Sequence, residues 1–348
     1  MLFSFSFLFL LTLLSFEDTW KKKPFRFLWP FIFLFVSYGV ATKIDEDEYR
    51  KFYYMIVERD SLGREYFWEF LYEKGWTFAL YTKLCNLMNT GSYIYLIFLT
   101  FITILIQKFF FYKYSLFPCL ALFLYFSHAF IIRDSITVRT GLASSLILVL
   151  ISSVADKKLF KFYIYLFIAT GIHYASVLGI VITFFKRLYS FLTYITFIAA
   201  SLLLSFFQIP KYILNFIADR FEIVKLYLNS EYTYQISFLH PKLFQQFVII
   251  LLIIFLVKKF RKEISDNKIL TLSINSYFFS TILFLAFKDF GIFAFRSATI
   301  FSVVEPLVII FITTKLFKAN SAWLICLSIS IAIFIINYIV LEKNTIFI

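Results

Sequence analysis

Apolar runs recur along the whole chain and limit what it can fold into more than any other feature. Most are roughly 14 to 21 residues long, and 61% of the 348 residues are hydrophobic. Lipid offers no water to unpaired backbone groups, so each long run that enters a bilayer must be helical. The sequence therefore predicts an all-α, polytopic transmembrane helical bundle that forms one integral membrane domain over residues 1–348. It excludes a soluble globular protein and a disordered one.

About ten of the runs are predicted as full spans, and we expect about 10–12 spans in all. These runs are residues 2–16, 27–42, 92–107, 114–132, 140–155, 190–207, 244–257, 269–287, 298–314 and 321–341. The stretch 162–185 is long enough for one more helix, but its centre, 170–176, is polar and contains a glycine. We expect a broken, re-entrant pair of short helices that meet at His173.

Basic residues indicate the orientation in the membrane. The formal net charge is +13, and the basic residues stand in short clusters between apolar runs, which argues against a nucleic-acid partner. If the stretch 162–185 breaks at His173, these clusters share one side, as the positive-inside rule requires. The N-terminus and two long loops, 43–91 and 208–243, then lie outside. The polar working surface of this multi-pass membrane protein is therefore expected to be extracytoplasmic.

Both outer loops contain an amphipathic stretch. In the second loop, apolar residues recur at helical spacing from Ile209 to Leu228, and Pro210 suits a first helical turn. In the first loop, Gly75 can end a preceding helix. The apolar stripe that follows it comprises Trp76, Leu80, Leu84, Leu87 and Met88. Each helix can lie in the membrane interface beside lipid, or it can pack on the ends of other spans.

Three arginines on the predicted outer side are candidates for binding phosphate. Arg133 and Arg139 stand in a short link between two strongly apolar spans, and Asp134 can neutralise one of them. Arg296 repeats this situation at the outer end of the predicted span 298–314. A guanidinium forms paired hydrogen bonds with phosphate oxygens. The alternative for each is an arginine that snorkels or forms an ion pair.

His173 and several carboxylates are candidates for acid–base chemistry. Histidine changes charge near neutral pH, and irregular backbone at membrane depth is tolerated where it lines a cavity. The carboxylates Asp45–Glu48 open the first outer loop and can bind a divalent ion or take a proton, or they can form a solvated run at a helix N-terminus. Glu305 lies inside a span, where it can serve the function or pair with a neighbouring helix. His128 and His240 are interpreted as structural.

Several motifs are absent from the sequence. There is no P-loop, GxSxG, HExxH or glycine-rich dinucleotide turn, and the three cysteines form no CxxC pair. We therefore expect no nucleotide hydrolysis, no serine hydrolase, no zinc site and no cofactor.

Two motifs together resemble the EpsG family, whose members are similar to the Wzy-type O-antigen and exopolysaccharide polymerases. The first is Val138–Ala143, with Arg139, and the second is Ala169–Ser176, with His173. The resemblance covers roughly residues 30 to 310. Asp156-Lys157-Lys158, Gly141, Ala143, Ser176, Asp45 with Tyr49, Glu73 with Gly75, and Arg296 also match features of the family. Thr140 stands where the family usually has Gln, and Thr170-Gly171 replaces an Ala-Ser pair.

The resemblance implies a polymerase that joins oligosaccharide repeat units carried on undecaprenyl pyrophosphate, at the outer face of the bacterial inner membrane. Arg139 and Arg296, with Arg133, would hold the pyrophosphate. His173, or failing it Glu73 or Asp45, would activate the acceptor hydroxyl. Partners would be the lipid-linked oligosaccharides, membrane lipid, and the chain-length regulator and flippase of the same pathway.

Other functions remain open at this point. A membrane glycosyltransferase that uses a lipid-phosphate sugar would suit the carboxylates at Asp45–Glu48. A lipid-linked sugar flippase or transporter should show internal repeats and a central path of charges, and the sequence shows no convincing repeat. A scaffold without catalytic activity would tolerate the loss of both Arg139 and His173.

Overall fold

The computed structural model describes residues 75–127, 137–218 and 240–343, together with residues 51, 53–55, 71, 220 and 234–238. Within these ranges every regular element is a helix. The predicted spans 2–16 and 27–42 lie outside the described residues and stay predictions, as does the end of the predicted span 114–132.

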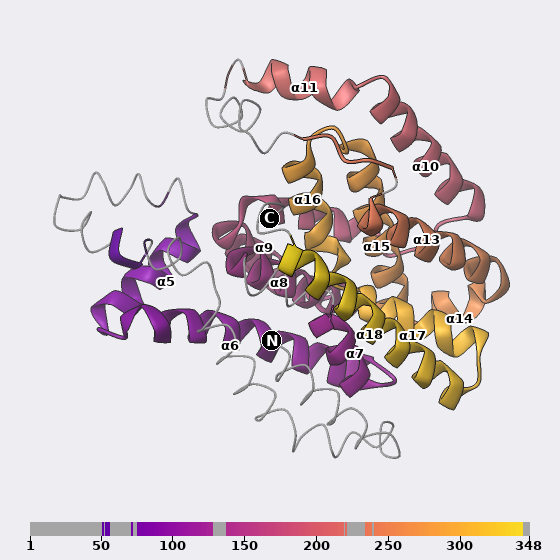
Figure 1. The fold of residues 1–348 in the computed structure, drawn as a ribbon, viewed down its shortest axis with the longest axis horizontal. Helices are drawn as coiled ribbons and strands as arrows, with labels where there is room; N and C mark the ends of the chain where they lie inside the picture. The colour runs from indigo at the N-terminus through magenta and orange to yellow at the C-terminus, as the bar shows by residue number, and fades with distance from the viewer. Residues whose placement is uncertain are drawn as a thin grey trace.

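The helices follow one another along the chain in the order shown in Figure 1. They are α5 (Trp76–Leu87), α6 (Gly91–Tyr114), α7 (Pro118–Tyr125), α8 (Val138–Ala155), α9 (Leu159–Ile172), the 3₁₀ helix η2 (Tyr174–Phe184), α10 (Phe191–Phe206), α11 (Ile209–Ala218), α13 (Pro241–Lys259), α14 (Arg261–Asp266), α15 (Lys268–Ala286), α16 (Gly291–Ser302), α17 (Glu305–Leu316) and α18 (Ala319–Lys343).

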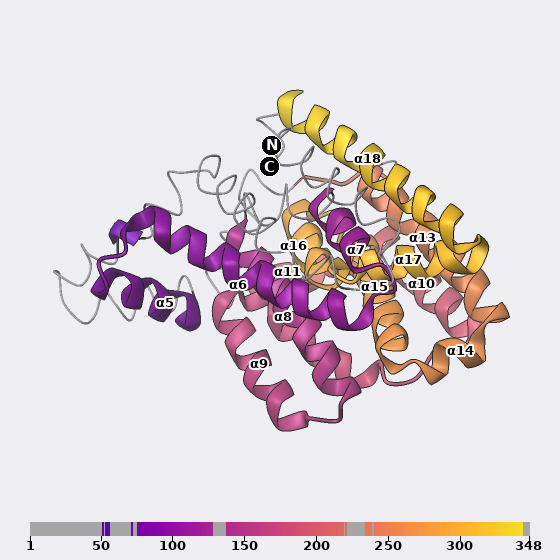
Figure 2. The same ribbon diagram turned by 90° about the horizontal axis from the view of Figure 1, so that it is seen from below.

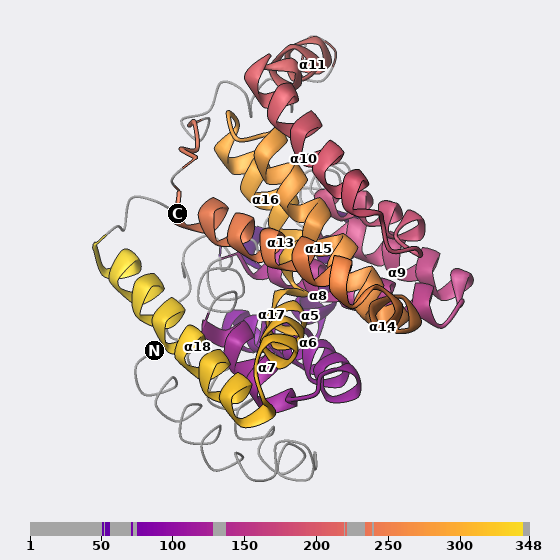
Figure 3. The same ribbon diagram turned by 90° about the vertical axis from the view of Figure 1, so that its right-hand side faces the viewer.

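Five of the described helices are long and apolar enough to cross a bilayer, namely α6, α8, α13, α15 and α18. Two bent pairs, α10–α11 and α16–α17, raise this number to as many as seven. The chain is therefore an all-helical, multi-pass membrane protein. Helices α8 and α15 are the most buried of the five, and α18 is the least buried. Figures 1 and 3 show α8 and α15 near the centre, and Figures 2 and 3 show α18 along one side.

The two bent pairs correct the predicted limits of two spans. In place of one span over 298–314, α16 and α17 meet at an angle of 57°, and Arg296 lies inside α16 rather than before a span. Pro306 in the first turn of α17 has no N–H to donate to the preceding turn, which favours the break. The predicted span 190–207 continues past a 64° bend into α11.

The predicted break at His173 is confirmed. His173 has an extended backbone (φ −149°, ψ 117°) and ends α9. A Cβ placed on Gly179 would lie 3.2 Å from Leu166 Cδ1 and 2.9 Å from Leu150 Cδ1. Since Leu166 and Gly179 lie on opposite sides of the break, η2 folds back along α9, and both pack on α8. Figure 2 shows α9 beside α8.

The two limbs of this hairpin have matching lengths. Helix α9 has 14 residues and is about 21 Å long, and η2 has 11 residues and is about 22 Å long because a 3₁₀ helix rises more per residue. Both fall short of the ~30 Å of hydrocarbon. The structure thus confirms a hairpin of two short helices, and its entry into and return from one side of the bilayer stays a prediction.

The predicted amphipathic stripes are present and exposed. On α5, the stripe residues Leu80, Leu84, Leu87 and Met88 are exposed. The first residue of the predicted stripe, Trp76, is instead partly buried against Phe167 and Tyr174 of the hairpin. On α11, the stripe residues Ile209, Ile213 and Phe216 are exposed, and the side chains of the rest of that predicted stripe are not described. Apolar stripes that no described helix covers favour a location against lipid over packing on the ends of other spans.

Candidate active site

The tip of the α9–η2 hairpin places a histidine at an irregular piece of backbone. The His173 N–H donates to the Ala169 carbonyl at 2.9 Å, and the His173 carbonyl accepts from the Ser176 N–H at 2.9 Å. The side-chain atoms His173 Nδ1 and Ser176 Oγ are buried and have no hydrogen-bond partner among the described residues. Buried polar atoms are usually paired, so these two suggest a site that receives a polar group.

Arg139 connects the start of α8 to this tip. Its Nε and Nη2 atoms donate to the Ile172 carbonyl at 3.2 and 3.1 Å. The carbonyls of the last turn of a helix lack intrahelical partners, and a basic side chain at that end satisfies them. The guanidinium also lies over the Phe78 ring of α5, 4.7 Å from its centroid. Arg139 therefore joins α8, α9 and α5 at one point.

Arg296 approaches the same tip from α16. Ala294 and Ala298 are buried against the end of α15, in a cluster with Phe284. Arg296 lies two positions from each alanine, so it projects from the other side of α16. Helix α16 also packs against α8 and η2. Its positive charge acts on His173 together with that of Arg139. The packing of α8, the hairpin and α16 thus gathers three predicted site residues that are distant in sequence into one region of the fold.

The surroundings of His173 favour its neutral form. It lies between α9 and η2, each of which is too short to cross the ~30 Å of hydrocarbon alone. Burial lowers the pKa of His173 below its ordinary value, and the charges of Arg139 and then Arg296 lower it further. A neutral imidazole has a nitrogen that can accept a proton.

Two glycines bring α5 against the hairpin tip. Gly75 has a φ of +92°, and a Cβ on it would lie 2.4 Å from the Gly171 carbonyl oxygen. A Cβ on Gly171 would lie 2.2 Å from Thr77 Oγ1 and 2.3 Å from Trp76 Nε1. The Gly75 N–H donates to the Leu71 carbonyl at 3.1 Å, as expected for a glycine that ends a helix. Sequence reasoning missed the contact between Gly75 and Gly171. The chain has only 8 glycines, so a glycine at each of these positions was a signal that could have pointed to a close approach.

Several predicted residues cannot be placed beside this tip. Asp45, Glu73, His128, Arg133 and Asp134 lie outside the described residues, so their roles stay predictions. Among the residues that the structure describes, no group of three or more His, Cys, Asp or Glu side chains could hold a metal ion.

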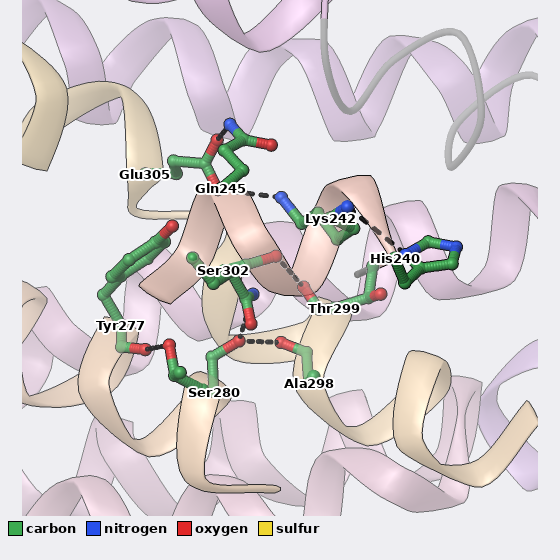
Figure 4. Close-up of polar contacts among 11 residues, drawn as sticks. His240, Lys242, Gln245, Tyr277, Ser280, Ala298, Thr299, Ser302 and Glu305 are labelled. Atoms are coloured by element: carbon green, nitrogen blue, oxygen red, sulfur yellow. Dashed lines mark hydrogen bonds and ion pairs between the residues drawn. The ribbon is translucent and has the colours of Figure 1, made fainter. Parts of the chain in front are cut away.

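The remaining two candidates lie at the start of α13 and in the first turn of α17. His240 Nδ1 accepts the Lys242 backbone N–H at 3.2 Å and so caps α13, which confirms its structural interpretation. Burial, and then the charge of Lys242, lower the pKa of His240, which keeps this acceptor unprotonated. Glu305 is paired rather than isolated, because Lys242 Nζ and Gln245 Nε2 donate to its carboxylate (Figure 4).

Comparison with known proteins gives one match. The model of the EpsG family matches residues 22–347, which is nearly the whole chain. No curated protein and no solved structure has a significant match to the chain.

Proposed function

Because this chain belongs to the EpsG family, whose multi-pass membrane proteins are linked to exopolysaccharide synthesis, we propose that it is a polysaccharide polymerase. It joins oligosaccharide repeat units carried on undecaprenyl pyrophosphate, at the extracytoplasmic face of the bacterial inner membrane. The observation that carries the proposal is the meeting of His173 with Arg139 and Arg296 at the tip of a re-entrant hairpin.

The hairpin supports the assignment of this face. Its limbs end at Lys157-Lys158 and at Lys186-Arg187, and they return to one side of the bilayer. Clusters of lysine and arginine in short loops favour the cytoplasmic side. The tip with His173 then points away from the cytoplasm, toward the side on which lipid-linked repeat units are joined.

The arginines suit the leaving group of this reaction. The acceptor hydroxyl oxygen forms a bond to the anomeric carbon of the donor glycan, and the bond from that carbon to the pyrophosphate oxygen breaks. The pyrophosphate leaves with the electron pair, and guanidinium groups stabilise the developing negative charge. In this proposal Arg139 and Arg296 hold the pyrophosphate, with Arg133 as a further candidate. Because the donor is already activated, the reaction needs no nucleotide.

His173 suits the acceptor side of the reaction. An imidazole whose pKa is lowered is neutral but a weak base. When an anionic pyrophosphate binds between the two arginines, it offsets their charges and raises the pKa of His173. The base therefore becomes strong enough to take the hydroxyl proton only when the donor is present. Glu73 and Asp45 are the alternatives for this role.

The test is a gel of cell-surface or lipid-linked polysaccharide from the source bacterium, with this gene deleted and then restored. We expect deletion to remove the ladder of long chains and leave single-repeat material. We expect Arg139→Ala not to restore the ladder. Long-chain polymer at the normal level from this variant would contradict the pyrophosphate role.

Arg261→Ala is the matched control. Its guanidinium also donates to backbone carbonyls at a helix connection, those of Tyr189 at 3.2 Å and Leu188 at 3.4 Å. It therefore loses a similar structural contact away from His173, and we expect it to restore the ladder. If deletion removes even the single-repeat form, the protein acts earlier, as a glycosyltransferase or a flippase.

A further inference from the structure

A second break in a membrane helix contains a buried charge that the proposed chemistry does not use. Glu305 opens α17 directly after the bend between α16 and α17, and its side chain is 2% exposed. Lys242 Nζ, on α13, lies 2.9 Å from Glu305 Oε2, and Gln245 Nε2 lies 2.8 Å from Oε1. The Tyr277 side chain of α15 also reaches toward this carboxylate (Figure 4).

Stability alone gives a poor reason for this pair. Removing two charges from water costs several kcal/mol per ion by general estimates, and packed apolar residues of similar volume often replace a buried pair without loss. A charged residue at membrane depth is costly as well. A buried pair does constrain how helices are placed, because its hydrogen bonds form only when the helices that carry it lie in one relative position.

The helix that this pair holds in place is the one that carries Arg296. Lys242 and Gln245 hold the start of α17, at one end of α16. Further along α16, Ser280 Oγ donates to the Ala298 carbonyl at 2.7 Å and accepts from Gln246 Nε2 at 3.1 Å. Helix α13 is thus linked to the α16–α17 segment at two places, directly at Glu305 and through Ser280 of α15 (Figure 4).

We propose that Glu305, with Lys242, is a positioning residue that fixes the bend between α16 and α17 and so directs Arg296 toward His173. This inference rests on the proposed function, in which Arg296 holds the pyrophosphate. Glu305 touches neither substrate nor His173 in this account. Loss of the pair leaves Arg296 present but lets α16 rotate or shift, and the two guanidinium groups no longer converge.

The test is a double-mutant cycle on the purified full-length protein in detergent, with the affinity for undecaprenyl pyrophosphate as the measurement. We expect Glu305→Gln to weaken binding about tenfold, within the range that coupled residues show. We expect Arg296→Ala to weaken it at least as much. In the Arg296→Ala background, Glu305→Gln should cause no further loss, because the residue through which it acts is gone.

A second variant distinguishes a loss of positioning from misfolding. Glu305→Gln leaves the Lys242 charge without its partner, whereas the double variant Lys242→Met/Glu305→Gln removes both charges and should show the same tenfold loss. Glu263→Gln is the matched control, because Glu263 also pairs with a lysine, Lys315 at the far end of α17, but is 55% exposed. We expect it to leave binding unchanged.

The outcomes separate this inference from the proposed function. Equal losses from Glu305→Gln with and without Arg296 would overturn the inference, because the effect would then be general. Normal binding by Lys242→Met/Glu305→Gln, while Arg296→Ala binds weakly, would overturn the inference alone. Normal binding by Arg296→Ala would overturn both the inference and the pyrophosphate role of Arg296.

Discussion

Among the described residues, apolar helices are broken or bent at three places, and two of these breaks, at the hairpin tip and before α17, are built in opposite ways. At the hairpin tip, the positive charges of Arg139 and Arg296 both act on His173, while His173 Nδ1 and Ser176 Oγ have no partner among the described residues. At the bend before α17, the single carboxylate of Glu305 receives hydrogen bonds from a lysine and a glutamine. Among the residues that the structure describes, the charges that act at the tip have one sign, whereas the charge at the bend is neutralised.

This difference shows how irregular backbone in a membrane can serve two purposes. A break whose charges are paired within the protein has nothing further to bind, so it fixes the placement of helices. A break whose charges have the same sign is stabilised by a ligand of the opposite sign. This contrast agrees with the two proposals, anion binding at the hairpin tip and positioning at the bend, and each proposal can be tested by experiment.

The largest expected effect comes from the histidine at the hairpin tip. His173→Ala removes the proposed base, and general base catalysis contributes about a hundredfold or more to a rate. We expect the ladder of long chains to disappear at an unchanged level of protein in the membrane, as seen on the polysaccharide gel and by immunoblot.

His240→Asn is the control for this variant. Asparagine is a favourable N-cap residue, so α13 keeps an acceptor at its start, and we expect a normal ladder. A normal ladder from His173→Ala would show that the hairpin tip is not catalytic. The two breaks would then not differ in this function.

An intermediate effect is expected from a glycine at the tip. In Gly171→Ala the new methyl group meets Thr77 and Trp76 at 2.2 and 2.3 Å, and overpacking of this kind costs about 1–3 kcal/mol. Pro306→Ala at the other break should cost less than about 1 kcal/mol, which is the usual effect of a proline on the unfolded chain. Thermal unfolding of the detergent-solubilised protein measures both. Equal losses would mean that α5 is not held tightly against the hairpin.

The smallest expected effect is on pH dependence. Burial and the charges of Arg139 and Arg296 lower the pKa of His173 in the free protein, so the acid limb of kcat/KM should lie below the ordinary histidine value of 6.5. Bound pyrophosphate offsets the arginine charges, so the acid limb of kcat, which reports the complex, should lie at higher pH. Polymerisation of purified lipid-linked repeat units over a pH series measures both. Coincident limbs would show that pyrophosphate does not approach His173.

Local sequence signals predicted the local features of this fold. The polar, glycine-containing segment around His173 predicted its break, and the spacing of Leu80, Leu84 and Leu87 predicted the exposed stripe of α5. Both features depend on residues that are neighbours along the chain. The bend before α17 was missed because Val303 and Val304 are as apolar as their neighbours, and Pro306 alone marks it.

The tertiary part of the candidate site could not be predicted. The motif resemblance singled out Arg139, His173 and Arg296, but no spacing rule relates residues on α8, the hairpin and α16. Their proximity depends on how three separate segments pack. The contact between Arg139 and the Ile172 carbonyl has no sequence signal either, because a backbone acceptor exists at every position.

The pair between Lys242 and Glu305 has a consequence for the order in which the protein is assembled. The two residues are 63 positions apart, so α13 is synthesised and delivered to the membrane well before α17. Lys242 lies at the end of its helix and can extend its ammonium group to the lipid headgroups until α17 is inserted. Glu305 lies between the two apolar helices of the α16–α17 pair, and an unpaired acidic residue inside an apolar span opposes insertion by up to about 2.5–3.5 kcal/mol. Insertion of α17 is therefore easiest when α13 is already in place as its neighbour, which makes biogenesis sequential from the middle of the chain toward its C-terminus.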